Sequence, residues 1–326
     1  MAVELRVQQG DVTEVPADVL LLKYAMSFHG ADEKVAARLI SQGVCKESQI
    51  QPQPWEAALV ETDGAIAASA ALFIGTPGLF GFRYPQMHQF ARQSLEWLRS
   101  QRVPVRHLTT TVHGAGYGLD VEEALLAMAA GFQDALAQGE VKGLETITFI
   151  ERKPQRADRL QHALSLLPSR RLESPARPVV SNRADRPAQG ESFRSPQEKK
   201  RVFVAMAFAD EFEDVYQFGI YDVVRRHGFV CERVDETALA GSIVDVIQDG
   251  IRNAEFVIAD LSGERPNVYL EVGYAWGLNR KVILVARENT RLHFDLSHHK
   301  CIFYKTIGKL AQELERTIVK LFPAAT

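Results

Sequence analysis

Two acidic residues late in the sequence, Asp260 and Glu271, have the types and spacing to act on a sugar carbon. Asp260 lies near the end of the apolar segment EFVIADL (255–261), which predicts a buried strand, and Glu271 lies about one turn into the helix predicted to follow. Because the helix dipole stabilises an anion near a helix start, we expect Glu271 to be ionised at neutral pH. An ionised carboxylate suits the oxocarbenium-like charge that develops when a glycosidic bond breaks. We therefore predict that Glu271 and Asp260 are catalytic.

Alternating strands and helices between residues 201 and 326 are expected to position these carboxylates. Apolar segments predict strands at 202–206, 229–234, 255–261, 281–286 and 301–305. Amphipathic segments predict helices at 212–227, 242–251, 267–278 and 307–321. This alternation is typical of a doubly wound, flavodoxin-like parallel sheet, and a 2-1-3-4-5 strand order would place a ligand crevice between the first and third strands.

The loops at that crevice supply the predicted substrate-binding residues. Phe208 follows the first strand and would stack on a nicotinamide or nucleobase ring. Asp235 follows the second strand, and Asn267 begins the helix that carries Glu271, so both would contact ribose or water. The sequence has no CxxC or HExxH pairing, and we expect no metal site and no cofactor other than the substrate.

The segment PNVYLEVGYA (266–275) resembles the TIR-like and nucleoside 2-deoxyribosyltransferase-like domains, and the likeness extends over 201–322. The resemblance implies that Glu271 is the covalent nucleophile of a transferase, or the glutamate that a TIR domain needs to cleave NAD. Asp260 resembles the acid that ends the third strand of the transferases. Their acid-x-Gly-Thr run is absent, and GERPNVYL (263–270) stands there instead, which favours a TIR-like domain.

The first half of the chain also alternates, which predicts a second three-layer α/β/α unit. Predicted strands lie at 5–9, 19–24, 58–64, 71–75, 107–114 and 146–152, and predicted helices at 31–40, 84–99, 121–136 and 156–167. The glycine-rich segment HGAGYGLDVEE (113–123) leads into one of these helices, where backbone N–H groups could hold a diphosphate. The glycines concerned are Gly114, Gly116 and Gly118.

This segment and GDVTEVPADVLLLKYA (10–25) resemble the phosphate-binding loop and the opening of macrodomains. The resemblance implies an ADP-ribose-type ligand, with Asp11 at its adenine. Two departures argue against ADP-ribosyl hydrolase activity. Lys23, Tyr24 and Ala25 replace the usual asparagine after the second strand, and FHGADEK (28–34) replaces a triple-glycine loop.

Composition divides the 326-residue chain into domains at 1–168 and 201–326, joined by an exposed linker at 169–200 that is rich in Pro, Ser, Arg and Glu. A net charge of −3 and the absence of a long apolar run give no reason to expect a nucleic-acid or membrane partner. Three scattered cysteines and no visible signal peptide predict a cytoplasmic protein.

Three functional hypotheses follow. The first, which the resemblance implies, is an NAD nucleosidase that is coupled to an ADP-ribose-type ligand in the macro-like domain, acts in bacterial antiviral defence and assembles as a homo-oligomer. The second is an N-glycosidase or deoxyribosyltransferase acting on another nucleoside or nucleotide. The third is a non-catalytic, nucleotide-sensing signalling protein. All three predict a small-molecule nucleotide as partner.

Overall fold

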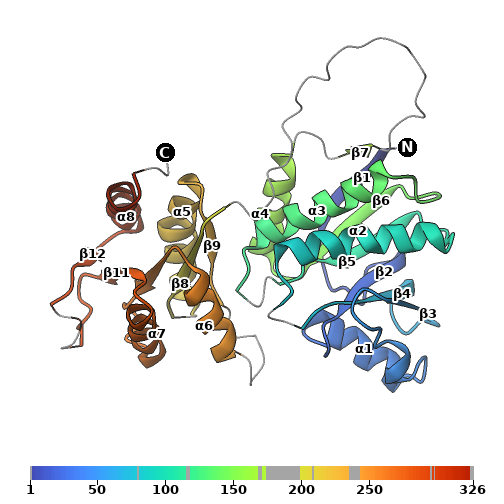
Figure 1. Ribbon diagram of the computed structural model, residues 1–326, viewed down its shortest axis with the longest axis horizontal. Coiled ribbons are helices and arrows are strands. Elements are labelled where there is room, and N and C mark those ends of the chain that lie inside the picture. Colours follow the sequence, from blue (N-terminus) through green and yellow to red (C-terminus); the bar gives the residue numbers. More distant parts are fainter. Residues whose placement is uncertain are drawn as a thin grey trace, which may run out of the picture. The chain divides into compact units, whose positions relative to one another are not determined.

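The computed structural model describes residues 2–78, 81–114, 118–167, 171–173, 199–207, 209–234, 243–293, 296 and 298–323. The chain divides into two compact units, Met1–Gly114 with Val121–Gln197, and Ala115–Asp120 with Glu198–Thr326. Each unit is built on its own sheet with helices packed against it (Figure 1). Within the part of the chain described, no helix is both long and apolar enough to cross a membrane.

The sheet of the first unit has the strand order β3-β4-β2-β5-β6-β1-β7 in the described residues. Its strands are β1 (Ala2–Gln9), β2 (Ala17–Tyr24), β3 (Ala57–Glu61), β4 (Ala68–Gly75), β5 (His107–Thr111), β6 (Thr146–Glu151) and β7 (Arg171–Glu173). The central strands pair in parallel, whereas β3 and β7 are antiparallel to their neighbours. The buried, apolar character of β2 and β4 fits a sheet that is covered on both faces.

Helices cover both faces of this sheet, as the sequence predicts. They are α1 (Ala31–Ser41), α2 (Tyr84–Ser100), α3 (Val121–Ala137) and α4 (Pro154–Ser165). Leu20 and Leu22 of β2 pack in one core with Val35 and Leu39 of α1, and so does Ile150 of β6. The neighbouring residue Phe149 points to the opposite face, where it lies 6.1 Å from the ring of Phe132 of α3.

The second unit is a parallel sheet with the order β12-β11-β10-β8-β9, which is the predicted 2-1-3-4-5 order. Its strands are β8 (Arg201–Ala205), β9 (Val230–Glu232), β10 (Phe256–Asp260), β11 (Lys281–Arg287) and β12 (Cys301–Tyr304). All pairings are parallel. The carboxyl ends of β8 and β10 therefore adjoin at the topological switch point.

Two helical layers cover this sheet. The helical segments are a 3₁₀ turn (Asp210–Phe212), a π-helix (Val215–Tyr221), α5 (Asp222–Arg226), α6 (Ile243–Asn253), α7 (Pro266–Gly277) and α8 (Ile307–Leu321). Val202 and Val204 of β8 share a core with Ile220 and with Leu310 of α8. The alternate residue Phe203 shares the other core with Val272 of α7. The doubly wound architecture is thus confirmed.

Two segments differ from the sequence prediction. Residues 171–173, placed in the linker by composition, form β7 beside β1, and Leu172 is buried there. The helix predicted at 212–227 is wound as a π-helix over Val215–Tyr221. Phe218, within this segment, is 55% exposed.

Candidate functional site

Glu271 lies in the second turn of α7, which the sheet positions at the carboxyl ends of its strands. Val268, Val272 and Ala275 anchor α7 to the core and leave Glu271 part-buried at the border of that apolar face. No hydrogen bond or ion pair joins Glu271 to another of the described residues. Burial raises the pKa of its carboxyl group to about 7.

The expectation that Glu271 tends to be ionised at neutral pH is therefore met only in part. The field of the helix dipole fades within the first turn, and Glu271 lies beyond it, so desolvation decides the equilibrium. A carboxyl group with a pKa of about 7 is present in both protonation states at neutral pH. A cation brought by a ligand would shift it to the ionised form.

Asp260 closes β10 and is buried, with 2% of its surface exposed. Its Oδ1 accepts a hydrogen bond from the backbone N–H of Ser262 at 2.8 Å, and its Oδ2 accepts one from the hydroxyl of Tyr304 at 3.0 Å. Burial raises the pKa of Asp260. The Oγ of Ser262 in turn accepts the backbone N–H of Arg287 at 2.8 Å. Asp260 thus ties the loop that leads into α7 to β11 and β12.

The geometry of Asp260 favours a positioning role, because both of its carboxylate oxygens accept internal hydrogen bonds. Its predicted catalytic role stays a prediction. The loops that follow β8 and β10 touch: a Cβ on Gly263 would lie 2.7 Å from the Cβ of Ala207. Glycine at 263 therefore sets how closely these two loops approach at the switch point.

The predicted substrate-binding residues are only partly described. Asn267 is the second residue of α7 and is exposed, one helical turn before Glu271 and on the same face. The same face continues to Tyr274, whose hydroxyl accepts a hydrogen bond from Arg252 of α6 at 2.8 Å. Phe208 and Asp235 lie outside the described residues.

In the first unit, the predicted adenine-binding residue Asp11 already has internal partners. It accepts hydrogen bonds from the backbone N–H of Thr13 at 3.0 Å and from its hydroxyl at 2.7 Å, and it forms an ion pair with Lys34. The Lys34 ammonium and these hydrogen bonds hold the pKa of Asp11 well below its usual range. The adenine contact stays a prediction.

The glycine-rich segment has the backbone that its glycines permit. Gly114 and Gly118 have φ angles of +84° and +87°, in the left-handed region, and Gly116 lies outside the described residues. The start of α3 is acidic, with Glu122 and Glu123 in its first turn. These carboxylates oppose the field that would attract a diphosphate, so the phosphate-binding role of the segment stays a prediction.

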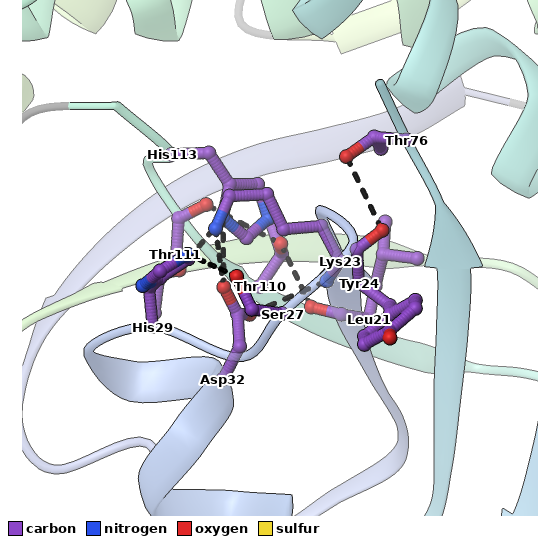
Figure 2. A network of polar contacts seen from close by, with 10 residues as sticks. All are labelled: Leu21, Lys23, Tyr24, Ser27, His29, Asp32, Thr76, Thr110, Thr111 and His113. Atoms are coloured by element: carbon purple, nitrogen blue, oxygen red, sulfur yellow. Dashed lines mark hydrogen bonds and ion pairs between the residues drawn. The ribbon is translucent and has the colours of Figure 1, made fainter. Parts of the chain in front are cut away.

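A buried polar network lies beside the carboxyl ends of β2 and β5 in the first unit (Figure 2). Nζ of Lys23 is 2.6 Å from Oδ2 of Asp32, and their side chains are 4% and 3% exposed. Nδ1 of His113 is 3.8 Å from the same oxygen. Burial lowers the pKa of His113 to about 4, so its ring is neutral at pH 7. The network therefore holds one ammonium and one carboxylate.

This network joins the two places where the sequence departs from the macrodomain pattern. Lys23 stands where the asparagine is expected, and Asp32 lies in FHGADEK, which replaces the glycine loop. The sequence alone did not indicate that a carboxylate lies near His113. The available signal was a lysine at the end of an otherwise apolar strand, since a buried ammonium requires a counter-charge. A second histidine, His29, has its Nε2 atom 2.7 Å from the hydroxyl oxygen of Ser27.

No protein-family model matches the sequence, and a search of curated proteins gives no match either. Solved structures that resemble parts of the chain include a macrodomain mutant of Oceanobacillus iheyensis, with 13% identity over 50% of this chain and 92% of that one, at a TM-score of 0.42. A Trypanosoma brucei macrodomain in complex with ADP-ribose has 16% identity over 49% and 69%, also at 0.42. A CMP N-glycosidase of Clostridium botulinum has 22% identity over 36% and 99%, at 0.30.

At these scores the structural likenesses carry no argument about function. The TIR-like resemblance of the second unit rests on its sequence alone and stays a prediction. Among the described residues, no group of three or more His, Cys, Asp or Glu side chains is placed to hold a metal ion.

Sequence reasoning missed Ser262, Tyr304 and Arg287 at the carboxyl edge of the second sheet. The signal for Arg287 and Tyr304 was their position, since each is the last residue of a parallel strand. Ser262 gave a weaker signal, because an aspartate side chain often accepts a hydrogen bond from the backbone N–H two residues later.

Proposed function

We propose that this chain cleaves the N-glycosidic bond between nicotinamide and ribose in NAD, with Glu271 as the catalytic carboxylate. The observation that supports this most is the contrast between two acids at one sheet edge. Asp260 is occupied by internal hydrogen bonds, whereas Glu271 has no hydrogen bond or ion pair with the other described residues. Of these two acids, Glu271 is therefore the one available to a positively charged ligand.

The carboxylate of Glu271 suits this bond. Nicotinamide leaves NAD as a neutral molecule, because the electron pair of the breaking C–N bond cancels the charge on the pyridinium ring. No proton donor is needed, and the positive charge passes to the ribose C1′, where the carboxylate of Glu271 stabilises it. Water then attacks C1′ and releases a proton, which gives ADP-ribose. An internal hydroxyl in place of water would give a cyclic product.

We also propose the wider setting that the sequence resemblance implies. The first unit would bind an ADP-ribose-type ligand and regulate cleavage, the chain would act as a homo-oligomer in the cytoplasm, and NAD loss would serve antiviral defence. The resemblance of 10–25 and 113–132 to macrodomains supports the ligand class.

The test is release of nicotinamide from NAD by purified protein at high concentration, with and without added ADP-ribose. We expect Glu271→Gln to lower kcat/KM by roughly a hundredfold or more, since the amide cannot supply a negative charge. Glu288→Gln, which changes an exposed carboxylate just after β11, is the matched control and should leave the rate unchanged. Equal rates for wild type and Glu271→Gln would refute the assignment.

A second candidate is an N-glycosidase acting on neutral nucleosides or nucleotides, and the raised pKa of Glu271 favours it. Below about pH 7 the group is mainly protonated and could donate a proton to a departing nucleobase. The pH dependence of cleavage distinguishes the two candidates, because one needs the ionised and the other the protonated form of Glu271.

A further inference from the structure

Two arginines lie at the carboxyl edge of the second sheet, on either side of the switch point. Arg287 is the last residue of β11, and Arg233 directly follows β9. Both reach the segment that follows β8. Nη2 of Arg233 lies 2.8 Å from Oε2 of Glu213, and Nη1 of Arg287 lies 3.2 Å from Oε2 of Glu211. Acidic side chains thus occupy both guanidinium groups at the edge where open parallel sheets bind ligands.

The arginines are held by rings that do not depend on these acids. The guanidinium carbon of Arg233 lies 3.8 Å from the centre of the Tyr216 ring, and that of Arg287 lies 4.8 Å from the centre of the Phe212 ring. Both rings are buried in the core of the unit. Stacking on a fixed ring orients a guanidinium group before any ligand arrives.

The glutamates, by contrast, are exposed and replaceable. The side chains of Glu211 and Glu213 are 63% and 48% exposed, so both carboxylates can turn out into water. Arg287 is itself 43% exposed, and an ion pair between two exposed side chains contributes little to stability. Arg233 is 12% exposed and is held mainly by the Tyr216 ring on which it stacks. A phosphate group carries more charge than a carboxylate and accepts paired hydrogen bonds from arginine. An anionic ligand at this edge can therefore displace them.

We propose that Arg233 and Arg287 bind phosphate groups of the substrate. In the absence of substrate, Glu213 and Glu211 form ion pairs with these two arginines. The inference deepens the proposed function, on which it rests, because it makes the substrate a phosphorylated nucleotide and excludes the free nucleoside. Arg287 is joined to the catalytic loop, since its backbone N–H donates to Ser262 in the loop that leads into α7 and Glu271.

Competition gives the proposal a signature that a structural role would not produce. If the pairs only stabilised the fold, removing either partner would weaken ligand binding or leave it unchanged. If the glutamates compete with phosphate, removing an arginine weakens binding and removing a glutamate strengthens it.

The experiment is calorimetric binding to the full chain carrying Glu271→Gln, so that turnover does not interfere. The probes are nicotinamide mononucleotide and nicotinamide riboside, which share the N-glycosidic bond and differ by one phosphate. Both lack the adenine that the first unit is predicted to hold, and loss of binding in the arginine variants assigns the phosphate contact to the second unit. Arg316→Gln, which removes an exposed pair with Glu313 on α8, is the control.

We expect Arg233→Gln and Arg287→Gln each to weaken binding of the mononucleotide about 10- to 100-fold, as loss of a hydrogen bond to a charged group does. Riboside binding should stay within about twofold, while Glu211→Gln and Glu213→Gln should tighten mononucleotide binding. Unchanged binding in the arginine variants, equal losses for both probes, or weaker binding in the glutamate variants would overturn the proposal.

The outcome is separable from that of the proposed function. If wild type cleaves neither probe but mononucleotide binding depends on the arginines, N-glycosidase activity fails and the phosphate site stands. If wild type cleaves both probes with equal kcat/KM, and the arginine variants do too, the phosphate site fails and the activity stands.

Discussion

Lys23 and Asp32 carry opposite charges at a place in the first unit that water hardly reaches. Their side chains are at most 4% exposed, and the neighbouring ring of His113 is neutral at pH 7, so each of the two charges depends on the other. Removing one partner of a buried pair leaves an uncompensated charge, which costs far more than the pair itself contributes. The pair therefore fixes how β2 and α1 meet.

Replacing Lys23 alone should be strongly destabilising. We expect Lys23→Met to lower the free energy of unfolding by about 3–5 kcal/mol, because Asp32 is left buried without a counter-charge. The double variant Lys23→Met/Asp32→Leu should recover much of that loss, since neither charge remains. Urea unfolding of the two variants beside wild type measures both effects, and a double variant less stable than the single one would contradict this account.

The pH dependence of cleavage follows from Glu271. Its folded pKa of about 7 means that the active carboxylate form accumulates as pH rises. For NAD we expect kcat/KM to rise about tenfold per pH unit below about pH 7 and to level off above it. If Glu271 instead protonates a leaving nucleobase, the rate on neutral nucleosides should fall through the same range. Steady-state rates between pH 5 and 9 decide between these profiles.

Glu271 also makes the free energy of unfolding depend on pH. Burial raises its pKa from 4.5 to about 7, so the folded state binds a proton more tightly than the unfolded state. The stability that this proton gives is fully present below pH 4.5 and is lost as pH rises through about 7. Glu271→Gln should therefore gain stability relative to wild type as pH increases across that window, which thermal melts at pH 5 and pH 8 would show.

At the scale of elements, burial patterns in the sequence predicted most of the fold. The bounds predicted for α8 are those observed, and the predicted strand order of the second sheet is confirmed because alternating apolar strands and helices allow few arrangements. The π-helix was not predictable, because the apolar residues from Val215 to Val224 have roughly the spacing of an ordinary helix. Nor was the Lys23–Asp32 pair, which joins strand β2 to the first turn of α1 by tertiary packing.

The position of the candidate site was predictable from the sequence, but the hydrogen bonding and protonation of its two acids were not. The sequence placed Glu271 and Asp260 at one sheet edge, yet it could not show that Asp260 would be satisfied internally by Tyr304, 44 residues later. Nor could it show how far burial would raise the pKa of Glu271. Both depend on desolvation by segments far apart in the chain.

Two helical glycines in the second unit have opposite surroundings, one crowded and one open. A Cβ on Gly250 of α6 would lie 2.7 Å from the ring of Phe203, which is buried in β8, whereas a Cβ on Gly273 of α7 would meet nothing within 4 Å. Gly250 thus allows α6 to approach the sheet, and Gly273 faces open space.

We expect Gly250→Ala to lower the free energy of unfolding by about 1–3 kcal/mol, because overpacking outweighs the better helix propensity of alanine. Gly273→Ala is the matched control, with the same chemical change in an uncrowded helix, and it should raise stability by up to about 1 kcal/mol. Thermal melts of both variants measure the difference. Stabilisation by both would mean that α6 shifts away from Phe203 at little cost.

At the scale of the whole molecule, the division into two compact units predicts how stability is distributed. Each unit has its own cores, so the free energy of unfolding belongs largely to each unit by itself, and two-state behaviour of the whole chain is not expected. Effects of substitutions in different cores should then add without coupling.

Calorimetry of three variants tests this distribution. Lys23→Met should lower the melting temperature of one transition and Gly250→Ala that of the other, and the variant with both changes should lower both by the same amounts. Nicotinamide mononucleotide should raise the melting temperature of only one transition, the one that Gly250→Ala shifts down, because a ligand stabilises the unit that binds it. A single transition that both substitutions shift equally would mean that the units unfold as one cooperative body. Any nucleotide signal sensed by the first unit would then reach Glu271 through a shared folding equilibrium.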